Sequence, residues 1–341
     1  IRDSPETLPD QDNPAISAIG ITKKFGQHTA VEQLCFDVFS GEIFGLVGPD
    51  GAGKSTSLRM LATIMDPDDG AAQIAGFDIA KDGTAVKDHL AYMSQKFGLY
   101  QDLTVAENIN FYADLYGVTR KGRQGRIEEL LDFSNMGPFI HRHAGKLSGG
   151  MKQKLQLICA LVHTPRVLLL DEPTNGVDPV SRRDFWRILH NIRQQGVAIL
   201  ITTAYLDEAE RCDRVGLIDH GKLLAVGTPD EAKQLMKGRI LTIRSNWARK
   251  IVGLVRGQPY TMSANLFGDT VHLVCRDIDK TREEVLHLLA GEKIDYEQVR
   301  ETSPSLEDVI VSILGDRQQT TVEHQPKSLF ASTESDKQGI A

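Results

Sequence analysis

The feature that most constrains this chain of 341 residues is the glycine-rich segment GPDGAGKST at positions 48–56. It follows the apolar run IFGLV and precedes a segment whose apolar residues recur at helical spacing. The segment fits the pattern G-x-x-x-x-G-K-[ST], in which glycines let successive backbone N–H groups turn inward and a helix N-terminus adds positive potential. Because a strand and a helix flank it, an ordinary glycine-rich turn explains it poorly. The sequence therefore predicts a cradle for phosphate groups, which we call the phosphate loop.

The phosphate loop predicts binding of a nucleoside triphosphate together with Mg²⁺. Lys54 is expected to reach the β- and γ-phosphates, and the Ser55 hydroxyl is expected to contact Mg²⁺. The nucleotide-binding residues predicted in this loop are Gly48, Pro49, Asp50, Gly51, Ala52, Gly53, Lys54, Ser55 and Thr56.

A second motif, VLLLDEP at 167–173, is an apolar run that ends in the adjacent carboxylates of Asp171 and Glu172. Asp171 is expected to hold Mg²⁺, mostly through water. Glu172 is placed to polarise the water that attacks a phosphorus atom. An Asp-Glu pair after a strand is usually a solvated turn, but its position after a phosphate loop favours the catalytic interpretation.

A third motif, KLSGGMKQKLQL at 146–157, predicts a helix that starts at a second anion site. Ser148 is a favourable N-cap residue, and Gly149 and Gly150 open the helix with exposed N–H groups. The chain already has one cradle for its own phosphates. A second one makes sense if it serves the nucleotide of a neighbouring molecule.

Two α/β domains are predicted along the chain. From 15 to about 237, short apolar runs alternate with helical stretches, which predicts a mainly parallel central sheet. Strand signals disappear in the middle of this region, so we expect a helical lobe over about 96–163. The runs are ISAIGI, IFGLVG, VLLLDE, VAILIT and VGLID.

The remainder of the chain predicts a small C-terminal accessory α/β domain over 239–315. Its last helix is expected to be amphipathic, with Leu306, Val309, Ile310 and Ile313 on one face. The polar stretches 1–14 and 316–341 are typical of a flexible leader and of a disordered tail or linker.

Taken together, these motifs resemble the ATP-binding cassette (ABC) ATPase family over roughly 16–237. Gln95 in YMSQKFGLY matches the family's Q-loop, and GVD at 176–178 matches its D-loop. Phe25 stands where the family has an aromatic residue that stacks on adenine. The resemblance implies an α/β P-loop NTPase fold of the ABC-ATPase type with a helical signature lobe, and ATP hydrolysis with Mg²⁺.

The resemblance also implies roles for single residues. Catalysis would rest on Glu172, Gln95 and Lys54, and Mg²⁺ would be held by Ser55, Gln95 and Asp171. LSGGM at 147–151 matches the family's signature motif. The family's head-to-tail dimer implies that each ATP lies between the phosphate loop of one cassette and the signature serine, Ser148, of the other. The resemblance also implies nucleotide-binding roles for Ser148, Gly149 and Gly150, which would serve a neighbour's nucleotide, and for Asp178 of the D-loop.

Within the family, the chain is most similar to the ATP-binding subunits of ABC-2-type exporters, including those for drugs. Met151 in LSGGM and the ending PSLEDVIVSIL at 304–314 are typical of that branch. Asp50, with QKFGLY and AGKLSGGMKQKL, is similar to the first half of tandem two-cassette proteins, and a start at Ile1 fits a piece of such a tandem. The implied partners are a second cassette, as a homodimer or a tandem sibling, and transmembrane permease subunits of the ABC-2 type. The implied location is cytoplasmic, peripheral on the cytoplasmic face of the cell membrane.

The groove beside the Q-loop in this family receives a short helix of the membrane subunit. An apolar and aromatic cluster follows Gln95 in this sequence, and we expect most of it to be lobe core with some members exposed for docking. Its members are Phe97, Leu99, Tyr100, Phe111, Tyr112 and Leu115.

One position departs from the family pattern. After the strand 199–201 and two threonines, Ala204 stands where the family usually has a histidine that bonds the γ-phosphate. One lost hydrogen bond to a charged group is worth ~1.5–3 kcal/mol, or roughly ten- to a hundredfold in rate. The sequence therefore predicts intact ATP binding and slow hydrolysis. Three explanations stay open. In the first, this is the slowly hydrolysing site of an asymmetric pair whose sibling cassette has the histidine. In the second, Tyr205 or Thr203 partly substitutes for the histidine. In the third, the alanine is a feature of this lineage without effect on hydrolysis.

Composition narrows the other classes of function. The net charge of −7 argues against a general nucleic-acid binder. No apolar run approaches the ~20 residues of a membrane-spanning helix, so we expect other polypeptides to form the pore. His141 and His143 are expected in a solvated loop, and Arg182 and Arg183 as solvated charges at a helix start rather than dimer contacts. The four cysteines, Cys35, Cys159, Cys212 and Cys275, are scattered and predict neither a zinc site nor a disulfide framework. Three of the four are expected as buried free thiols.

Two alternative functions stay open. A soluble ABC-type assembly factor or ribosome-associated ATPase would share the motifs, although the acidic balance of the chain speaks against RNA binding. A regulatory nucleotide-binding module that scarcely hydrolyses would fit Ala204 but not the intact Glu172. The transported substrate is not encoded in this chain, because membrane subunits would select it.

Overall fold

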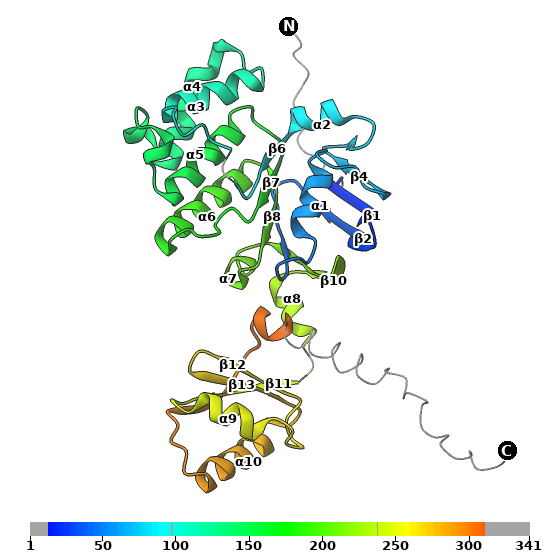
Figure 1. The fold of residues 1–341 in the computed structure, drawn as a ribbon, viewed down its shortest axis with the longest axis vertical. Helices are drawn as coiled ribbons and strands as arrows, with labels where there is room; N and C mark the ends of the chain where they lie inside the picture. The colour runs from blue at the N-terminus through cyan, green and yellow to red at the C-terminus, as the bar shows by residue number, and fades with distance from the viewer. Residues whose placement is uncertain (1–12, 97, 237, 311–341) are drawn as a thin grey trace, which may run out of the picture. The chain divides into compact units, whose positions relative to one another are not determined.

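The computed structural model describes residues 13–310 except 97 and 237 (Figure 1). The chain divides into two compact units, Ile1–Gln234 and Leu235–Ala341. The predicted division between 237 and 239 falls near this boundary, and the predicted domain limits stay predictions. The predicted leader up to residue 12 and the predicted tail 316–341 lie outside the described residues.

An antiparallel sheet opens the first unit. Its strand order is β2-β1-β4-β5. The run ISAIGI, predicted as part of the parallel sheet, lies in β1 and pairs antiparallel with both β2 and β4. The reason is local, because only two residues separate β1 from β2 and a hairpin that short forces antiparallel pairing. The strands are β1 (Ile16–Phe25), β2 (His28–Val38), β4 (Asp69–Ile74) and β5 (Phe77–Asp78).

The second sheet of this unit is the mainly parallel one that the sequence predicts. Its order is β10-β9-β3-β8-β7-β6, and only the β10–β9 pair is antiparallel. Strands β3 and β7 are buried along their whole length, as expected for parallel strands covered on both faces. The strands are β3 (Ile43–Val47), β6 (Leu90–Met93), β7 (Val167–Asp171), β8 (Ala198–Thr203), β9 (Arg214–Asp219) and β10 (Lys222–Gly227).

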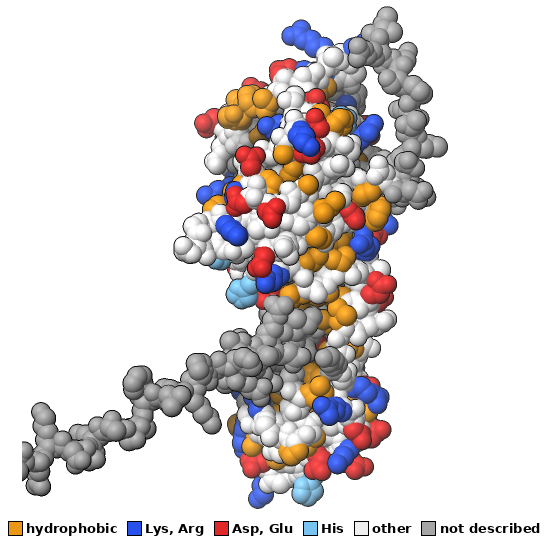
Figure 2. All heavy atoms as spheres, turned by 90° about the vertical axis from the view of Figure 1, so that its right-hand side faces the viewer, with side chains coloured by type: hydrophobic (Ala, Val, Ile, Leu, Met, Phe, Trp, Pro, Cys, Tyr) orange, Lys and Arg blue, Asp and Glu red, His pale blue; other side chains and the backbone are white. Residues whose placement is uncertain are grey.

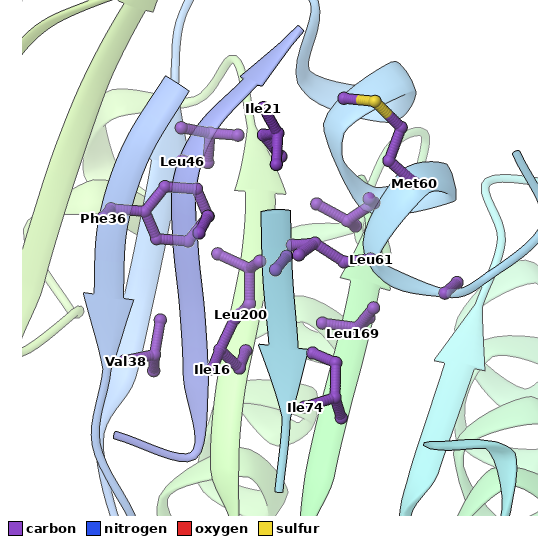
Figure 3. Close-up of a cluster of buried hydrophobic side chains, with 14 of the residues drawn as sticks. Ile16, Ile21, Phe36, Val38, Leu46, Met60, Leu61, Ile74, Leu169 and Leu200 are labelled. Carbon is purple, nitrogen blue, oxygen red and sulfur yellow. The ribbon is translucent and has the colours of Figure 1, made fainter. Parts of the chain in front are cut away.

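The main core of the first unit lies between these two sheets. Helix α1 (Lys54–Leu61) packs against both of them, while α6 (Pro179–Gln194) packs against β8 (Figure 1). Apolar side chains of β1, β2 and β4 meet those of β3, β7, β8 and α1 in one buried cluster (Figure 3). The parallel sheet is therefore packed against this core, which positions the loops at its strand ends.

The predicted helical lobe is confirmed as a run of helices between β6 and β7. Helix α3 begins with a capping box in which the Thr104 side chain and Glu107 bond reciprocally. Helix α5 begins at the predicted N-cap, Ser148. The lobe contains α3 (Val105–Leu115), α4 (Arg120–Ser134), the short 3₁₀ helices η1 (Gly137–Phe139) and η2 (Ala144–Lys146), and α5 (Gly149–Leu161). The remaining helices of the first unit are α2 (Gly83–His89), α7 (Leu206–Ala209) and α8 (Pro229–Gln234).

The second unit is an antiparallel sheet with two helices in β-α-β-β-α-β order. The sheet order β12-β13-β11-β14 gives it the ferredoxin-like topology. The two helices share one apolar core with the sheet. Strand β12 was not predicted. The elements are β11 (Arg239–Arg244), α9 (Ala248–Val255), β12 (Ser263–Phe267), β13 (Thr270–Cys275), α10 (Ile278–Gly291) and β14 (Gln298–Thr302).

The described part of the predicted final helix, residues 306–310, lies on the sheet face opposite α9 and α10 (Figure 1). Leu306 and Val309 are fully buried there, as the predicted amphipathic face requires. Ile313 lies outside the described residues. On this face His272 bonds Asp308 at 2.8 Å between Nδ1 and Oδ1, which ties the helix to β13.

Charges of both signs are interspersed on the face of the molecule that Figure 2 shows. None of the helices in the described part of the chain combines the length and the apolar character needed to cross a bilayer.

Candidate active site

Four strands of the parallel sheet deliver their carboxyl ends to the same edge. In the order β3-β8-β7-β6, these strands lead into the phosphate loop, Ala204, Glu172 and Gln95. Parallel neighbours necessarily end on the same side, and that edge is where ligands bind in α/β sheets. The topology thus brings together residues that are far apart in the sequence.

The phosphate loop is shaped by glycines at positions where other residues would not fit. Gly53 has φ +104°, and a Cβ there would clash with the carbonyl oxygen of Ala30. Lys54 is 4% exposed and lies under the loop. Its ammonium donates to the carbonyl oxygens of Gly48 at 2.8 Å and Pro49 at 3.0 Å. The lysine is thus held where phosphate oxygens would enter.

A cavity of about 310 Å³ opens above the phosphate loop. Phe25, the predicted adenine-stacking residue, lines it together with the loop and Glu172. Phe25 is half-exposed at the end of β1, so its ring is available for stacking. His28 also lines the cavity and was not predicted from the sequence. The short turn between β1 and β2, which pairs His28 with Phe25, is the feature that could have identified it.

Asp171 is buried at the end of β7 and is held by three hydroxyl groups. Ser55 donates to its Oδ1 at 2.8 Å and Thr202 donates to the same atom at 2.9 Å, while Tyr92 donates to its Oδ2 at 3.3 Å. Burial and the neighbouring carboxylate raise the pKa of Tyr92 to about 12, so its hydroxyl stays protonated and keeps donating. Sequence reasoning named Ser55 but missed Thr202 and Tyr92, because only the sheet register places them beside Asp171.

Glu172 is held by a larger set of contacts. Its backbone has φ +46°, an uncommon conformation that is found at functional sites, and its N–H donates to the Thr202 hydroxyl at 3.0 Å. Its Oε1 lies 3.3 Å from the Lys54 ammonium. Its Oε2 accepts from Gln95 Nε2 at 2.9 Å and from Asn175 Nδ2 at 3.3 Å. The three predicted catalytic residues therefore meet, with Lys54 and Gln95 both contacting the Glu172 carboxylate, and Asn175 is an additional member.

Ala204 follows β8 and is exposed beside this cluster. The neighbouring Thr203 hydroxyl is buried and donates to Glu208 Oε2 at 2.8 Å, so it faces away from the phosphate loop. The Tyr205 hydroxyl donates to Asn175 Oδ1 at 3.4 Å. Of the two substitutes considered for the histidine, Tyr205 is the one connected to the active site.

The signature residues do not line this cavity. Ser148 is exposed, and its Oγ accepts from the N–H of Met151 at 3.3 Å as a helix cap. Gly149 has open space around its Cα, whereas Gly150 packs tightly on Ser181 of α6. Asp178 caps α6, accepting from two backbone N–H groups, and the bond from Ser181 lowers the pKa of its carboxyl. These residues stand apart from the phosphate loop of their own chain.

The aromatic cluster of the lobe is mostly on the surface, so the prediction that most of it is core is wrong. Tyr100, Phe111 and Leu115 are exposed, the last at 65%. The buried face of α3 is instead formed by Val105, Asn108, Ile109 and Ala113. Phe97 lies outside the described residues. The end of α3 borders a second cavity of about 630 Å³, which α2 and the end of α5 also line.

Two lesser predictions have definite outcomes. Arg182 is not a solvated charge, because it stacks on the Tyr205 ring at 4.5 Å and pairs with Asp207 and Glu208 of its own chain. Arg183 is exposed, as predicted. The prediction of three buried free thiols is confirmed: Cys159, Cys212 and Cys275 are buried and Cys35 is exposed.

The histidines of the HRH segment are exposed in the loop before the signature helix. His143 bonds the carbonyl oxygen of Asp102 through Nδ1 at 2.9 Å. That contact links two loops of the lobe and gives His143 a structural role.

Comparison with known proteins gives a consistent result. The family model described as ABC transporter matches residues 31–175. The chain is 44% identical over 304 residues to the probable multidrug ABC transporter ATP-binding protein YbhF of Escherichia coli (strain K12), covering 88% of this chain and 52% of that protein. It is 36% identical over 272 residues to the daunorubicin/doxorubicin resistance ATP-binding protein DrrA of Streptomyces peucetius, covering 80% of each. A solved ATP-binding subunit of an ABC transporter matches with TM-score 0.60 and 28% identity, covering 64% of this chain and 92% of that one. The chain thus spans about half the length of the first of these relatives.

Proposed function

The chain belongs to the ATP-binding cassette family of ABC transporters, which hydrolyses ATP, and from that premise we propose that it powers a membrane exporter of the ABC-2 type. One observation carries the proposal. The ammonium of Lys54, the hydroxyl of Ser55 and the carboxylates of Asp171 and Glu172 meet at one edge of the sheet, beside a cavity lined by Phe25.

In the proposed reaction, the backbone N–H groups of the phosphate loop and Lys54 hold the β- and γ-phosphates of ATP. Glu172 orients a water molecule and draws on its proton. The water oxygen bonds to the γ-phosphorus while the bond from that phosphorus to the β–γ bridging oxygen breaks. The products are ADP and inorganic phosphate. Gln95, already bonded to Glu172, keeps the carboxylate directed at the water.

The residues around Asp171 fit Mg²⁺. Ser55 Oγ and Asp171 Oδ1 lie 2.8 Å apart, and both are hard oxygen donors of the kind that Mg²⁺ prefers. We propose that these two residues, with Gln95, hold the ion. When bound, Mg²⁺ would neutralise charge on the β- and γ-phosphate oxygens.

We propose that a second cassette, either another copy or a sibling, completes each nucleotide site. Ser148 and Gly149 are exposed at the start of α5 and lie outside the cavity of their own chain. A helix N-terminus with exposed N–H groups suits the γ-phosphate of a nucleotide held by a neighbour. Asp178, at the start of α6, would join the same interface.

We propose that transmembrane subunits dock on the lobe beside Gln95, at the cytoplasmic face of the membrane. Tyr100, Phe111 and Leu115 expose apolar surface there, and the cavity at the end of α3 is bordered by Leu115 and Tyr116. Large exposed apolar side chains on a charged protein surface mark interaction sites. The same lobe carries the signature helix, so docking would couple nucleotide binding to the membrane subunits.

We propose that this site hydrolyses ATP slowly, because Ala204 supplies no donor to the γ-phosphate while Lys54, Asp171 and Glu172 are in place. The test is Ala204→His in the assembled transporter. Restoring one donor to a charged group should raise the rate of ATP hydrolysis about ten- to a hundredfold, with little change in ATP affinity. An unchanged rate, with ATP still bound, would show that the alanine does not limit hydrolysis.

A further inference from the structure

A chain of hydrogen bonds runs from Tyr205 to the proposed catalytic carboxylate. The Tyr205 hydroxyl donates to Asn175 Oδ1 at 3.4 Å, and Asn175 Nδ2 donates to Glu172 Oε2 at 3.3 Å. All donors in this chain point toward the carboxylate. Tyr205 directly follows Ala204, so this series of hydrogen bonds starts next to the position that lacks a donor.

Two kinds of contact, a backbone hydrogen bond and a stacked guanidinium, hold the Tyr205 ring in place. Its backbone N–H donates to the Thr203 hydroxyl at 2.9 Å. The Arg182 guanidinium stacks on the ring at 4.5 Å and is fixed in turn by Glu208, whose Oε1 lies 3.6 Å from Arg182 Nε. Glu208 is fully buried and also accepts from Thr174 and Thr203. A ring held in this way can direct its hydroxyl at a fixed point.

Asn175 needs such a partner, because the two ends of its amide have opposite hydrogen-bonding character. With the Tyr205 hydroxyl donating to Oδ1, the amide presents its NH₂ group to Glu172. A reversed amide would turn its oxygen toward the carboxylate, which is repulsive. The carboxylate thus selects the NH₂ end of Asn175, and the Tyr205 hydroxyl, which donates to Oδ1, holds the amide in that orientation from its other side.

We propose that Tyr205 is a positioning residue for hydrolysis: acting through Asn175, it holds the Glu172 carboxylate in its working orientation in a site without the histidine. This inference rests on the proposed hydrolysis of ATP at the phosphate loop. Glu172 also accepts from Gln95 and pairs with Lys54, so the tyrosine refines its orientation and does not create it.

The experiment uses Tyr205→Phe, which removes one oxygen and keeps the ring that stacks on Arg182. The ATPase rate constant kcat should fall about three- to tenfold, the range of one neutral hydrogen bond, while KM and the dissociation constant for MgATP stay unchanged. Tyr296→Phe is the matched control, because Tyr296 is an exposed tyrosine of the second unit and should keep the wild-type kcat.

A double-mutant cycle then tests the connection through Asn175. Because Tyr205 acts through that residue, Tyr205→Phe should have no further effect on kcat in an Asn175→Ala background. Equal losses of kcat in both backgrounds would overturn the proposed action of Tyr205 through Asn175. An unchanged kcat in Tyr205→Phe would also overturn it, as would a change in MgATP affinity, which would reveal direct contact with the nucleotide. Failure of the proposed function is distinguishable, because the wild-type chain itself would then neither bind nor hydrolyse MgATP.

Discussion

The two units of this protein use paired polar side chains in opposite ways. In the first unit, Lys54 and Glu172 lie 3.3 Å apart beside an open cavity, and the carboxylate accepts further bonds from the amide side chains of Gln95 and Asn175. In the second unit, His272 and Asp308 lie 2.8 Å apart between a sheet and a helix. Under the proposed function the first pair exchanges its partner for a ligand, whereas the second pair fastens one element to another.

Sheet topology explains this difference. Neighbouring parallel strands end at the same edge, so β3, β8, β7 and β6 collect their polar ends in one place. In the all-antiparallel sheet of the second unit, neighbouring strands end at opposite edges, so polar strand ends are dispersed. The comparison teaches that closely paired polar side chains acquire different roles from the sheet that carries them.

The largest expected difference between the two units is in MgATP binding after a lysine is removed from each. Lys54→Ala should weaken MgATP binding about a hundredfold or more, because charge-assisted bonds to phosphate are lost. Lys250→Ala removes an exposed pair with Glu292 in the second unit, and surface pairs contribute little. Calorimetric titration with MgATP measures both. Equal effects of the two substitutions would contradict the contrast between the units.

Two glycine substitutions, one in each unit, test the same contrast between the units with a smaller expected effect. Gly53→Ala forces a Cβ against the Ala30 carbonyl at φ +104°, and should weaken MgATP binding at least about tenfold. Gly253, in helix α9, has open space around it, so Gly253→Ala should stabilise the second unit by about 0.5–1 kcal/mol. Titration and denaturant unfolding measure the two results. Normal ATP affinity in Gly53→Ala would show that the loop does not need its observed shape.

The smallest expected effect concerns the hydrogen bond between His272 and Asp308 in the second unit. His272→Leu leaves Asp308 bonded only by Ser305, and should lower the free energy of unfolding of this unit by about 1 kcal/mol at neutral pH. Hydrogen exchange in β13 and α10 measures this change, and MgATP affinity should not change.

Acidification should remove the difference between His272→Leu and the wild type. Burial opposes ionisation of Asp308, but bonds from His272 and Ser305 outweigh it, so the folded-state pKa lies below the ordinary 3.8. A depressed carboxyl pKa stabilises the fold above the unfolded value, and that contribution is lost as the pH falls through the folded one. A difference that stayed constant from pH 7 down to pH 3 would contradict this account.

Most of the site could be predicted from the sequence because its motifs are local. The phosphate loop, the Asp171-Glu172 pair and the Ser148 cap each depend on a short stretch of chain, so their residues and neighbouring elements were identified in advance. Thr202 and Asn175 were missed because their contacts with these carboxylates depend on sheet register and on a turn. No spacing in the sequence reveals such contacts.

The errors in the predicted fold have the same origin. The run ISAIGI has the composition of a buried parallel strand, and only its two-residue connection to β2 makes it antiparallel. In α3, Phe111 and Leu115 are exposed while Asn108 is fully buried. Its amide donates to the carbonyl oxygens of Tyr100, Leu103 and Thr104, so a polar residue caps the loop from inside. Apolar composition alone therefore selected the wrong face of this helix.

The most direct test of the central claim is a measurement of MgATP binding and phosphate release on the same samples of wild-type and Glu172→Gln protein. The account holds that the strand ends of the parallel sheet bind ATP and that Glu172 orients the attacking water. It predicts that the variant binds MgATP as the wild type does and releases phosphate about 10²–10⁴-fold more slowly. Phosphate release by the variant at the wild-type rate would contradict it.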